Sequence, residues 1–425
     1  MASSPDVYIL GIGNSHVGRY PNSSFTELCR QAVSAAAADA FLTDGPLPAE
    51  MVWFGNFMMD SWGQRAVRGQ EALMPLMEEG ILQLGATVIN VEDACASGSV
   101  AFNGALTYIS SGRGDVALAV GVEKMNSSSA DPVERKKFMA NGLAAGQGVL
   151  SDSFWDPFRK LATKNGLEFS TSPDRSFAMD IYALWTKDYM ATYGTTIEQI
   201  AQVAVKNHNN GALNDRAQYR FTTTLDEVMQ DRVVASPLTR AMCAPSTDGA
   251  AAALVCSEEF LRRQPAAVQR RAVRVLGQGI AGGVRYASWG DERAPVRAAA
   301  SAFQQAGISV ADIDVVELHD ASAFAEIHLI EDIGLCGRGE GGPLTMSGAT
   351  EIGGDIAVSP SGGLLSRGHP IGATGLLMLR EITDQLRGEA GAYQVPGAKI
   401  GLAENGGGFA GTDVAVCSVT ILARA

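Results

Sequence analysis

A cysteine stands between a predicted strand and a predicted helix. The segment reads Val91-Glu-Asp-Ala-Cys95-Ala-Ser-Gly-Ser, so small residues surround the thiol. At a helix N-terminus, unpaired backbone N–H groups and the helix dipole favour a thiolate. Small neighbours also let a substrate carbonyl approach the sulfur. A lone cysteine is more often structural, but this context makes Cys95 a candidate nucleophile.

Two histidines could assist that cysteine. His319 ends the apolar run Val315–His319, and the carboxyl ends of strands are where ligands bind in open α/β sheets. His369 stands in the glycine-rich turn Gly368–Gly372, which opens the next predicted helix. A neutral imidazole there could take the Cys95 proton and then stabilise an oxyanion. A satisfied core histidine is the alternative at position 319, and a phosphate cradle is the alternative for the glycine-rich turn.

A last glycine-rich turn follows the predicted strand Lys399–Ala403 and reads Glu404-Asn-Gly406-Gly-Gly-Phe. Backbone N–H groups in such a turn can line an oxyanion hole. Glu404 could transfer a proton there, and a solvated turn carboxylate is the competing interpretation. Because its ordinary pKa is ~4.3, burial would have to raise that pKa for the group to act near neutrality.

Two further segments could hold a ligand. The turn Cys243-Ala-Pro-Ser246-Thr-Asp-Gly leads into a predicted strand and is interpreted as a structural or ligand-lining loop. The segment Lys206–Phe221, which contains Arg216 and Arg220, mixes basic and aromatic side chains in an acidic protein. Such a mixture could hold the phosphates of coenzyme A and stack on its adenine, although a solvated helix and turn would have a similar sequence.

The elements that must position these residues form two similar series along the chain. Short apolar runs that end in glycine or polar residues predict strands, with helical patterns between them. The predicted strands are Val7–Gly13, Met51–Phe57, Ala86–Val91, Val116–Val122, Ala250–Cys256, Val273–Ile280, Val315–His319, Ile356–Ser359, Lys399–Ala403 and Val414–Leu422. The predicted helices include Ser24–Ala40, Gly98–Ser110, Val296–Ala306 and Thr374–Leu386. This alternation predicts an α/β fold with mainly parallel sheets, and the repeated order indicates a duplication.

A long segment, residues 125–240, separates the fourth and fifth predicted strands and is rich in Met, Trp, Tyr and charged residues. Loops of this length usually are functional or carry helices of their own. We therefore expect a lid-like inserted domain. The predicted division is residues 1–124 with 241–265 as the N-terminal half, 125–240 as the insertion, and 266–425 as the C-terminal half.

Composition excludes several classes of protein. The chain has 425 residues, 46% apolar and 19% charged, which allows a large buried core. Its formal net charge of −13 argues against nucleic acid as a partner. The six cysteines are scattered, so we expect free thiols, no bound metal and a reducing compartment. We also expect no signal peptide, no membrane span and a cytoplasmic location, since no run approaches the ~20 apolar residues of a spanning helix.

Taken together, the ordered motifs resemble those of the thiolase superfamily over nearly the whole chain. They are Cys-Ala-Ser-Gly at Cys95, Asp-Gly-Ala-Ala-Ala before a strand, His319-Asp320, Gly-His-Pro at His369 with its Gly-Ala-Thr-Gly tail, and the final glycine-rich loop. The His-Asp pair and the stretch 206–221 are similar to the sterol-carrier-protein-2 type. This resemblance implies a five-layered αβαβα thiolase fold from two similar halves, and a homodimer or homotetramer.

For chemistry, the resemblance implies an acyltransferase of lipid metabolism that forms an acyl-Cys95 intermediate from acyl-CoA. His369 would activate Cys95 and share one oxyanion hole with His319, and the backbone N–H groups of Cys95 and Gly406 would form another. The reaction would be thiolytic cleavage of a β-ketoacyl-CoA or its formation by Claisen condensation. Coenzyme A would be a substrate, with no permanently bound cofactor. The candidate coenzyme A ligands are Arg216, Arg220 and Ser246.

Two departures from the pattern concern carbon–carbon bond chemistry. Ordinary thiolases carry a second cysteine in the last loop, where this chain has Glu404, and the sterol-carrier type often has it after His-Asp, where this chain has Ala321. Glu404 is the candidate substitute. The alternatives are an acyltransferase with a non-CoA acceptor, a retro-aldolase, or a non-catalytic subunit that pairs with a small OB-fold protein. A ketoacyl synthase would need a basic face for its acidic carrier protein, of which the net charge gives no hint.

Overall fold

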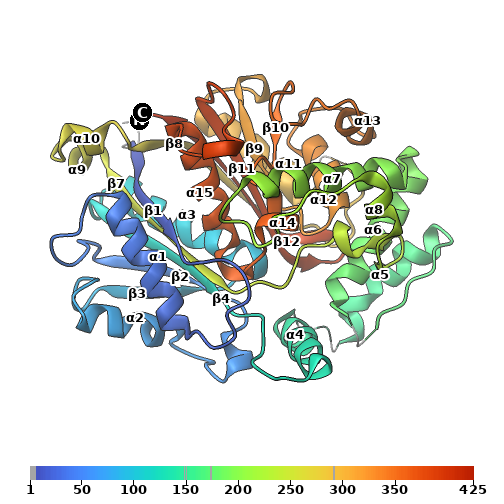
Figure 1. Cartoon of the computed structure of the whole chain (residues 1–425), viewed down its shortest axis with the longest axis horizontal. Helices are drawn as coiled ribbons and strands as arrows, with labels where there is room; N and C mark the ends of the chain where they lie inside the picture. Colours follow the sequence, from blue (N-terminus) through green and yellow to red (C-terminus); the bar gives the residue numbers. More distant parts are fainter. Residues whose placement is uncertain (1–5, 148, 150, 173–174, 291) are drawn as a thin grey trace.

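The computed structural model describes residues 6–147, 149, 151–172, 175–290 and 292–425. Figure 1 shows two sheet-containing halves next to each other, with a largely helical segment over the C-terminal half. The expected lack of a signal peptide concerns residues 1–5, which lie outside the described ranges. Within those ranges, no helix is both long and apolar enough to cross a membrane.

The ten predicted strands pair in one continuous sheet. Their order across the sheet is β10 (Ala357–Val358), β9 (Val315–Glu317), β11 (Ile400–Ala410), β12 (Asp413–Arg424), β8 (Val273–Gly282), β1 (Val7–Asn14), β7 (Gly249–Ser257), β4 (Val116–Glu123), β2 (Met51–Gly55) and β3 (Thr87–Val91). β1 and β8 join the halves at the centre, where Val7, Tyr8 and Ile9 pair with Val275, Arg274 and Val273. The sheet therefore runs through both halves without interruption.

The order of the strands agrees with the predicted duplication. From the centre outward it is β1-β7-β4-β2-β3 in one half and β8-β12-β11-β9-β10 in the other. The prediction of mainly parallel sheets was wrong. β2 pairs in parallel with β3 and β4, and β9 pairs in parallel with β10 and β11, but the five remaining pairs are antiparallel. One reason is that a tight turn joins β11 directly to β12, and such a turn permits only antiparallel pairing.

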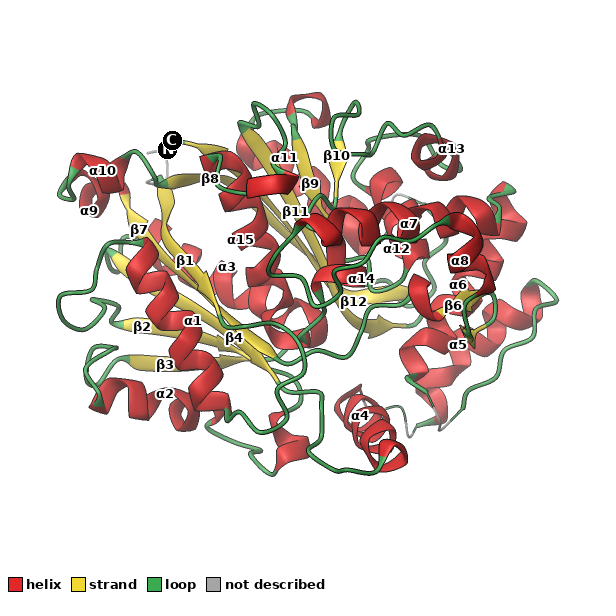
Figure 2. Ribbon diagram, viewed as in Figure 1, coloured by secondary structure: helices red, strands yellow, loops and turns green. Residues whose placement is uncertain are grey.

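Helices form three layers around the two halves of the sheet (Figure 2). α3 (Ser97–Ser110) and α15 (Thr374–Arg387) pack against each other in the middle. α1 (Phe25–Asp39) and α2 (Arg68–Glu78) cover the N-terminal half, and α11 (Ala294–Ala306) covers the C-terminal half with α12 (Ala323–Asp332) beside it. This arrangement gives the five layers that the resemblance implies. Small helices α9 (Glu258–Arg262) and α10 (Ala266–Gln269) connect β7 to β8.

The segment between β4 and β7 is mostly helical. It contains α4 (Pro132–Gln147), α5 (Asp152–Lys164), α6 (Phe177–Tyr193), α7 (Ile197–Leu213), α8 (Leu225–Gln230), β5 (Val233–Ala235) and β6 (Leu238–Thr239). Capping boxes begin α7 and α8, since Thr196 and Thr224 each exchange hydrogen bonds with the residue three positions on. α7 packs against α12, α13 (Gly341–Met346) and α14 (Gly363–Arg367), which fixes the insertion on the C-terminal half.

Candidate active site

Cys95 lies in the short 3-10 helix η2 (Ala94–Ala96), which leads from β3 into α3. Ala94 has a φ of 48°, a left-handed conformation that costs a non-glycine residue on the order of 1–3 kcal/mol. The Ser97 hydroxyl holds this turn, because it accepts the Asp93 backbone N–H at 2.9 Å and donates to the Ala94 carbonyl at 2.7 Å. The turn presents the thiol to a cavity of about 490 Å³.

The structure brings Cys95, His319 and His369 together. The Cys95 sulfur and one ring nitrogen from each histidine lie within 4.8 Å of one another. The two imidazole ring centroids are 5.1 Å apart, and all three residues line the same cavity. Cys95 comes from the N-terminal half, whereas His319 follows β9 and His369 follows α14 in the C-terminal half. The cluster therefore exists only where the two halves meet.

Glycines allow this close meeting of the halves. A Cβ atom at Gly121 would lie 2.3 Å from the Gly372 carbonyl oxygen, and one at Gly375 would lie 2.0 Å from the Ser99 hydroxyl. Both distances are far too short for a real side chain. The turn that carries His369 can therefore pack directly on β4 and α3 only because these positions are glycine.

The hydroxyl of Thr374 fixes the tautomer of His369. Thr374 Oγ1 lies 3.0 Å from the Pro370 carbonyl oxygen and 2.8 Å from His369 Nδ1. A carbonyl can only accept, so the single hydroxyl proton goes to Pro370 and His369 Nδ1–H must donate to Thr374. His369 Nε2 is then left with its lone pair. This is the tautomer that can take a proton from Cys95.

Burial keeps the thiol and both imidazoles uncharged. It raises the pKa of Cys95 to about 12, with Glu123 adding to the rise, although the backbone N–H groups of Gly408 and Cys95 act in the opposite direction. Burial also lowers the pKa of His319 to about 3 and holds the pKa of His369 well below 6.5. The backbone N–H groups thus act on the thiol in the expected direction, but desolvation outweighs them. The resting site pairs a neutral thiol with a neutral imidazole.

Sequence reasoning missed two residues of the site, Glu123 and Gly408. The buried carboxylate of Glu123 accepts the backbone N–H groups of Phe57 and Met58, both at 3.0 Å, and of Gly372 at 3.1 Å. It thereby joins the end of β2 to the turn that carries the second histidine. Glu123 could have been found from the sequence, because it is an acidic residue at the end of an otherwise apolar strand. Gly408 could have been found because it belongs to the run of three glycines.

Gly406 and Glu404 both belong to β11, but only Gly406 is among the described residues that line the cavity. Glu404 is 1% exposed. Its Oε2 accepts the His319 backbone N–H at 3.1 Å, and its Oε1 accepts the Cys417 thiol at 3.1 Å. Burial raises the pKa of Glu404 to about 7, as proton transfer near neutrality requires. Both carboxylate oxygens are nevertheless engaged by protein donors.

The candidate ligands for coenzyme A lie in different places. Ser246 lines the cavity, and Arg220 is exposed beside Tyr219, which lines the cavity as well. The parallel bridge between Ser246 and His369 places this loop directly beside the catalytic cluster. Ser246 is thus open to a ligand that enters the cavity, and Arg220 is open to solvent next to a residue of the cavity wall.

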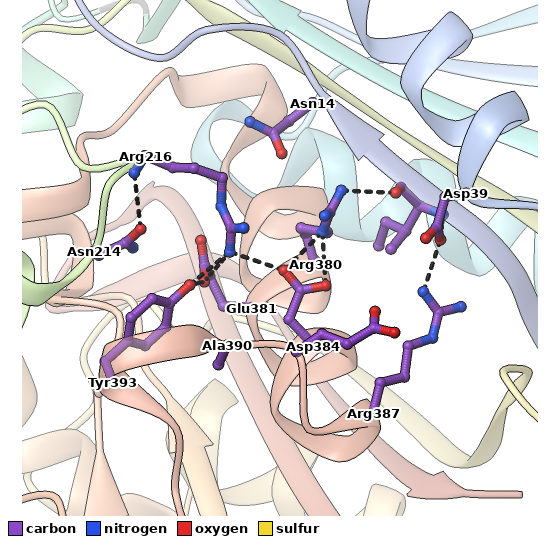
Figure 3. A network of polar contacts seen from close by, with 12 residues as sticks. Asn14, Asp39, Asn214, Arg216, Arg380, Glu381, Asp384, Arg387, Ala390 and Tyr393 are labelled. Atoms are coloured by element: carbon purple, nitrogen blue, oxygen red, sulfur yellow. Dashed lines mark hydrogen bonds and ion pairs between the residues drawn. The ribbon is translucent and has the colours of Figure 1, made fainter.

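Arg216 is engaged within the protein. Its guanidinium lies 2.8 Å from Asp384 and 3.1 Å from Glu381, both on α15. Figure 3 shows this network, in which the Tyr393 hydroxyl also contacts Arg216. Among the described residues Arg216 does not belong to the cavity wall. The expected phosphate contact is therefore replaced by ion pairs that tie the insertion to the middle layer.

Comparisons with known proteins agree with this geometry. Family models of the thiolase N-terminal domain and of the thiolase C-terminal domain-like region match residues 7–259 and 285–422. An acetyl-CoA acetyltransferase of Methanothermobacter thermautotrophicus is 35% identical over 96% of this chain and 97% of its own length. The benzoylsuccinyl-CoA thiolase subunit BbsB of Thauera aromatica is 32% identical over 92% and 91%. Sterol carrier protein 2 of Rattus norvegicus is 32% identical over 94% of this chain and 70% of its own length.

Solved structures share the fold. The Ltp2-ChsH2(DUF35) aldolase superposes with a TM-score of 0.75 at 21% identity, covering 100% of this chain and 99% of that one. Human mitochondrial 3-ketoacyl-CoA thiolase in complex with CoA gives a TM-score of 0.65 at 16% identity, with coverage of 100% and 99%. The thiolase fold is therefore confirmed. Since the family models match most of the chain and the relatives match nearly all of it, this protein belongs to the thiolase family.

Proposed function

We propose that this chain is a thiolase-type acyltransferase that forms an acyl-Cys95 intermediate from acyl-CoA. It would cleave a β-ketoacyl-CoA or form one by Claisen condensation. The observation that carries the proposal is the cluster of Cys95, His319 and His369 within 4.8 Å, with His369 Nε2 left as the base. A retro-aldolase has no need of a thiol nucleophile, so this cluster favours acyl transfer.

In the first step, His369 Nε2 takes the Cys95 proton while the sulfur attacks the substrate carbonyl. The new C–S bond leaves negative charge on the carbonyl oxygen, which the backbone N–H groups of Cys95 and Gly406 would stabilise. Collapse of this adduct breaks the carbon–carbon bond of a β-ketoacyl-CoA, and the electron pair departs with the thioester fragment as an enolate. The result is an acyl group on Cys95.

His319 would stabilise that enolate. Its Nε2 is buried and has no hydrogen-bond partner among the described residues. An unpaired polar atom in a buried site is costly, and the oxygen of a bound thioester would supply the missing partner. In the second half of the reaction, the thiol of coenzyme A would take the acyl group and give its proton to the group that protonated the enolate carbon, while His369 returns its proton to the departing Cys95 sulfur.

The enolate carbon must also receive a proton, and we keep Glu404 as a proposal for this role. Its raised pKa of about 7 supports it, whereas its contacts with His319 and Cys417 support a positioning role instead. Glu404→Gln separates the two. Loss of turnover with acylation of Cys95 intact would support proton transfer. Slower acylation would support positioning, and unchanged turnover would remove Glu404 from the mechanism.

Ser246 and Arg220 are the residues we propose for coenzyme A, because Ser246 lines the cavity and Arg220 is exposed and follows Tyr219, which lines the cavity. We also propose a homodimer through β3. This strand ends the sheet, and all five of its residues are at least partly exposed. Unpaired strand edges of this kind join readily to another strand.

A small OB-fold partner is a further proposal, supported by the neighbour whose name includes ChsH2(DUF35).

The proposed acylation is tested by the intact mass of the protein after brief incubation with acetyl-CoA and longer acyl-CoAs. We expect a gain equal to the acyl group, absent from Cys95→Ser. Cys336→Ser is a matched control, since Cys336 is also half-buried but belongs to another part of the chain. No gain with any donor, or a gain that persists in Cys95→Ser, would contradict the proposal.

A further inference from the structure

The cavity beside Cys95 has two chemically different walls. One contains the turn 243–246 and part of β5, with the exposed Arg232 just before β5 and the exposed Arg240 just after β6. The other is formed by α4, α6 and Phe409, and it is largely apolar. Its side chains include Phe57, Met139, Leu143, Phe177, Tyr182 and Phe409. The first wall suits a polar, charged carrier, and the second suits an apolar group.

Phe409 places this apolar wall next to the reacting atoms. It follows Gly408, whose backbone N–H reaches the Cys95 sulfur. The Phe409 ring meets Phe177 at a centroid distance of 6.0 Å and Tyr182 at 5.9 Å, both edge to face. An acyl group on Cys95 would therefore extend toward aromatic rings.

Two polar side chains on this side of the cavity are engaged within the protein, whereas Lys136 of α4 is exposed. Gln147 Oε1 accepts the Phe409 backbone N–H at 3.2 Å, and Arg175 forms an ion pair with the buried Asp180. These contacts leave the rings and the neighbouring methionine, Met179, to face a ligand. A wall of this kind contributes binding energy only to a ligand with its own large apolar surface.

We propose that the acyl group carried by Cys95 is an aryl acyl group, whose ring packs against Phe177, Tyr182 and Phe409. Aromatic rings pair edge to face at centroid separations of ~4.5–7 Å, and methionine sulfur also contacts ring edges favourably. An acetyl group would leave most of this wall uncovered. The proposal rests on the acyl transfer proposed above and deepens it by naming the class of substrate.

The test compares the acylation rates of Cys95 with phenylacetyl-CoA, octanoyl-CoA and acetyl-CoA at equal, subsaturating concentration. Phenylacetyl and octanoyl have the same number of carbons, and neither conjugates its carbonyl, so they differ mainly in the ring. We expect phenylacetyl-CoA to react at least about tenfold faster than either other donor, equivalent to about 1.4 kcal/mol. Equal or faster reaction of octanoyl-CoA or acetyl-CoA would overturn the aryl proposal alone. No acylation by any donor would overturn acyl transfer as well.

A filled cavity gives an independent test. Ala178 lines the apolar wall on α6, between Phe177 and Met179. In Ala178→Phe the new ring occupies the space proposed for the substrate ring, so the ratio of phenylacetylation to acetylation rates should fall at least about tenfold. Ala191→Phe is the control, since Ala191 is exposed on the same helix and should leave the ratio unchanged. A ratio in Ala178→Phe equal to that of Ala191→Phe would refute the proposed ring position.

Discussion

The contact between Thr374 and His369 allows a direct test of the base. In Thr374→Val, the Nδ1–H of His369 loses its acceptor at 2.8 Å, and the Pro370 carbonyl loses the hydroxyl donor at 3.0 Å but keeps the Ala373 backbone N–H at 2.8 Å. The tautomer of His369 with the proton on Nδ1 and a free lone pair on Nε2 is then no longer favoured over the tautomer with the proton on Nε2. An unsatisfied buried donor costs about 1–3 kcal/mol, so acylation of Cys95 should slow by roughly 10- to 100-fold.

The assay is stopped-flow or quenched acylation of Cys95 by the best acyl-CoA, with the free energy of unfolding measured in parallel. Thr374→Ser keeps the hydroxyl and should retain most of the rate. Thr383→Val is the matched control, because Thr383 is buried on the same helix and its hydroxyl has no partner among the described residues. A folded Thr374→Val protein that acylates as fast as Thr383→Val would refute the assignment of His369 Nε2 as the base.

Three further predictions concern protons and metal. The rate of Cys95 alkylation by iodoacetamide should keep rising with pH up to about pH 10, since burial raises the pKa of the thiol to about 12. A rate that reaches its plateau below about pH 7 would instead indicate a thiolate–imidazolium pair. Burial raises the pKa values of Glu123, Glu317 and Glu404 to about 7, above the ~4.3 of an unfolded chain, so the folded state binds more protons between those values. These glutamates make stability fall as pH rises through this window, whereas the buried neutral histidines, such as His319 and His369, make it rise. The slope of urea-derived stability against pH should therefore be more positive in Glu404→Gln than in the wild type, and an unchanged slope would contradict the assignment. Micromolar Zn²⁺ should inhibit acylation, because a thiol and two imidazoles within 4.8 Å of one another match the ligands that zinc prefers. Addition of EDTA should restore the acylation rate. An acylation rate unaffected by Zn²⁺ would count against this geometry.

The sequence predicted the strands well because apolar runs bounded by glycine are a local signal. β1 was predicted as Val7–Gly13 and spans Val7–Asn14. β11 was predicted to end at Ala403 but continues to Ala410, through three glycines. It does so because β12 supplies a partner for every one of its residues except Gly408, as in the pairing of Gly406 with Cys417. Partners of this kind cannot be read from the strand itself.

In the candidate site, too, some properties follow from the local sequence and others depend on residues far along the chain. The residue types at Cys95, His319 and His369 indicated the chemistry, and the fold brought them together. Burial raises the pKa of the thiol, and burial depends on the other half of the chain, so the helix-end argument had the right sign but lacked the larger effect. Likewise, Arg216 was predicted to bind phosphate because of its positive charge. Its carboxylate partners lie on α15, far along the sequence, and could not be identified from the segment around Arg216.

The matching strand orders of the two halves have an evolutionary consequence. β3 leads into Cys95, whereas its counterpart β10 leads into a turn that begins at Ser359. Similarly, β9 leads toward His319, whereas its counterpart β2 leads into the loop held by Glu123. One copy thus supplies the nucleophile and the other supplies the proton carriers. A symmetric ancestor built from two identical copies would have had the same side chain at both strand ends. The two copies have therefore diverged at these strand ends while keeping the same strand order.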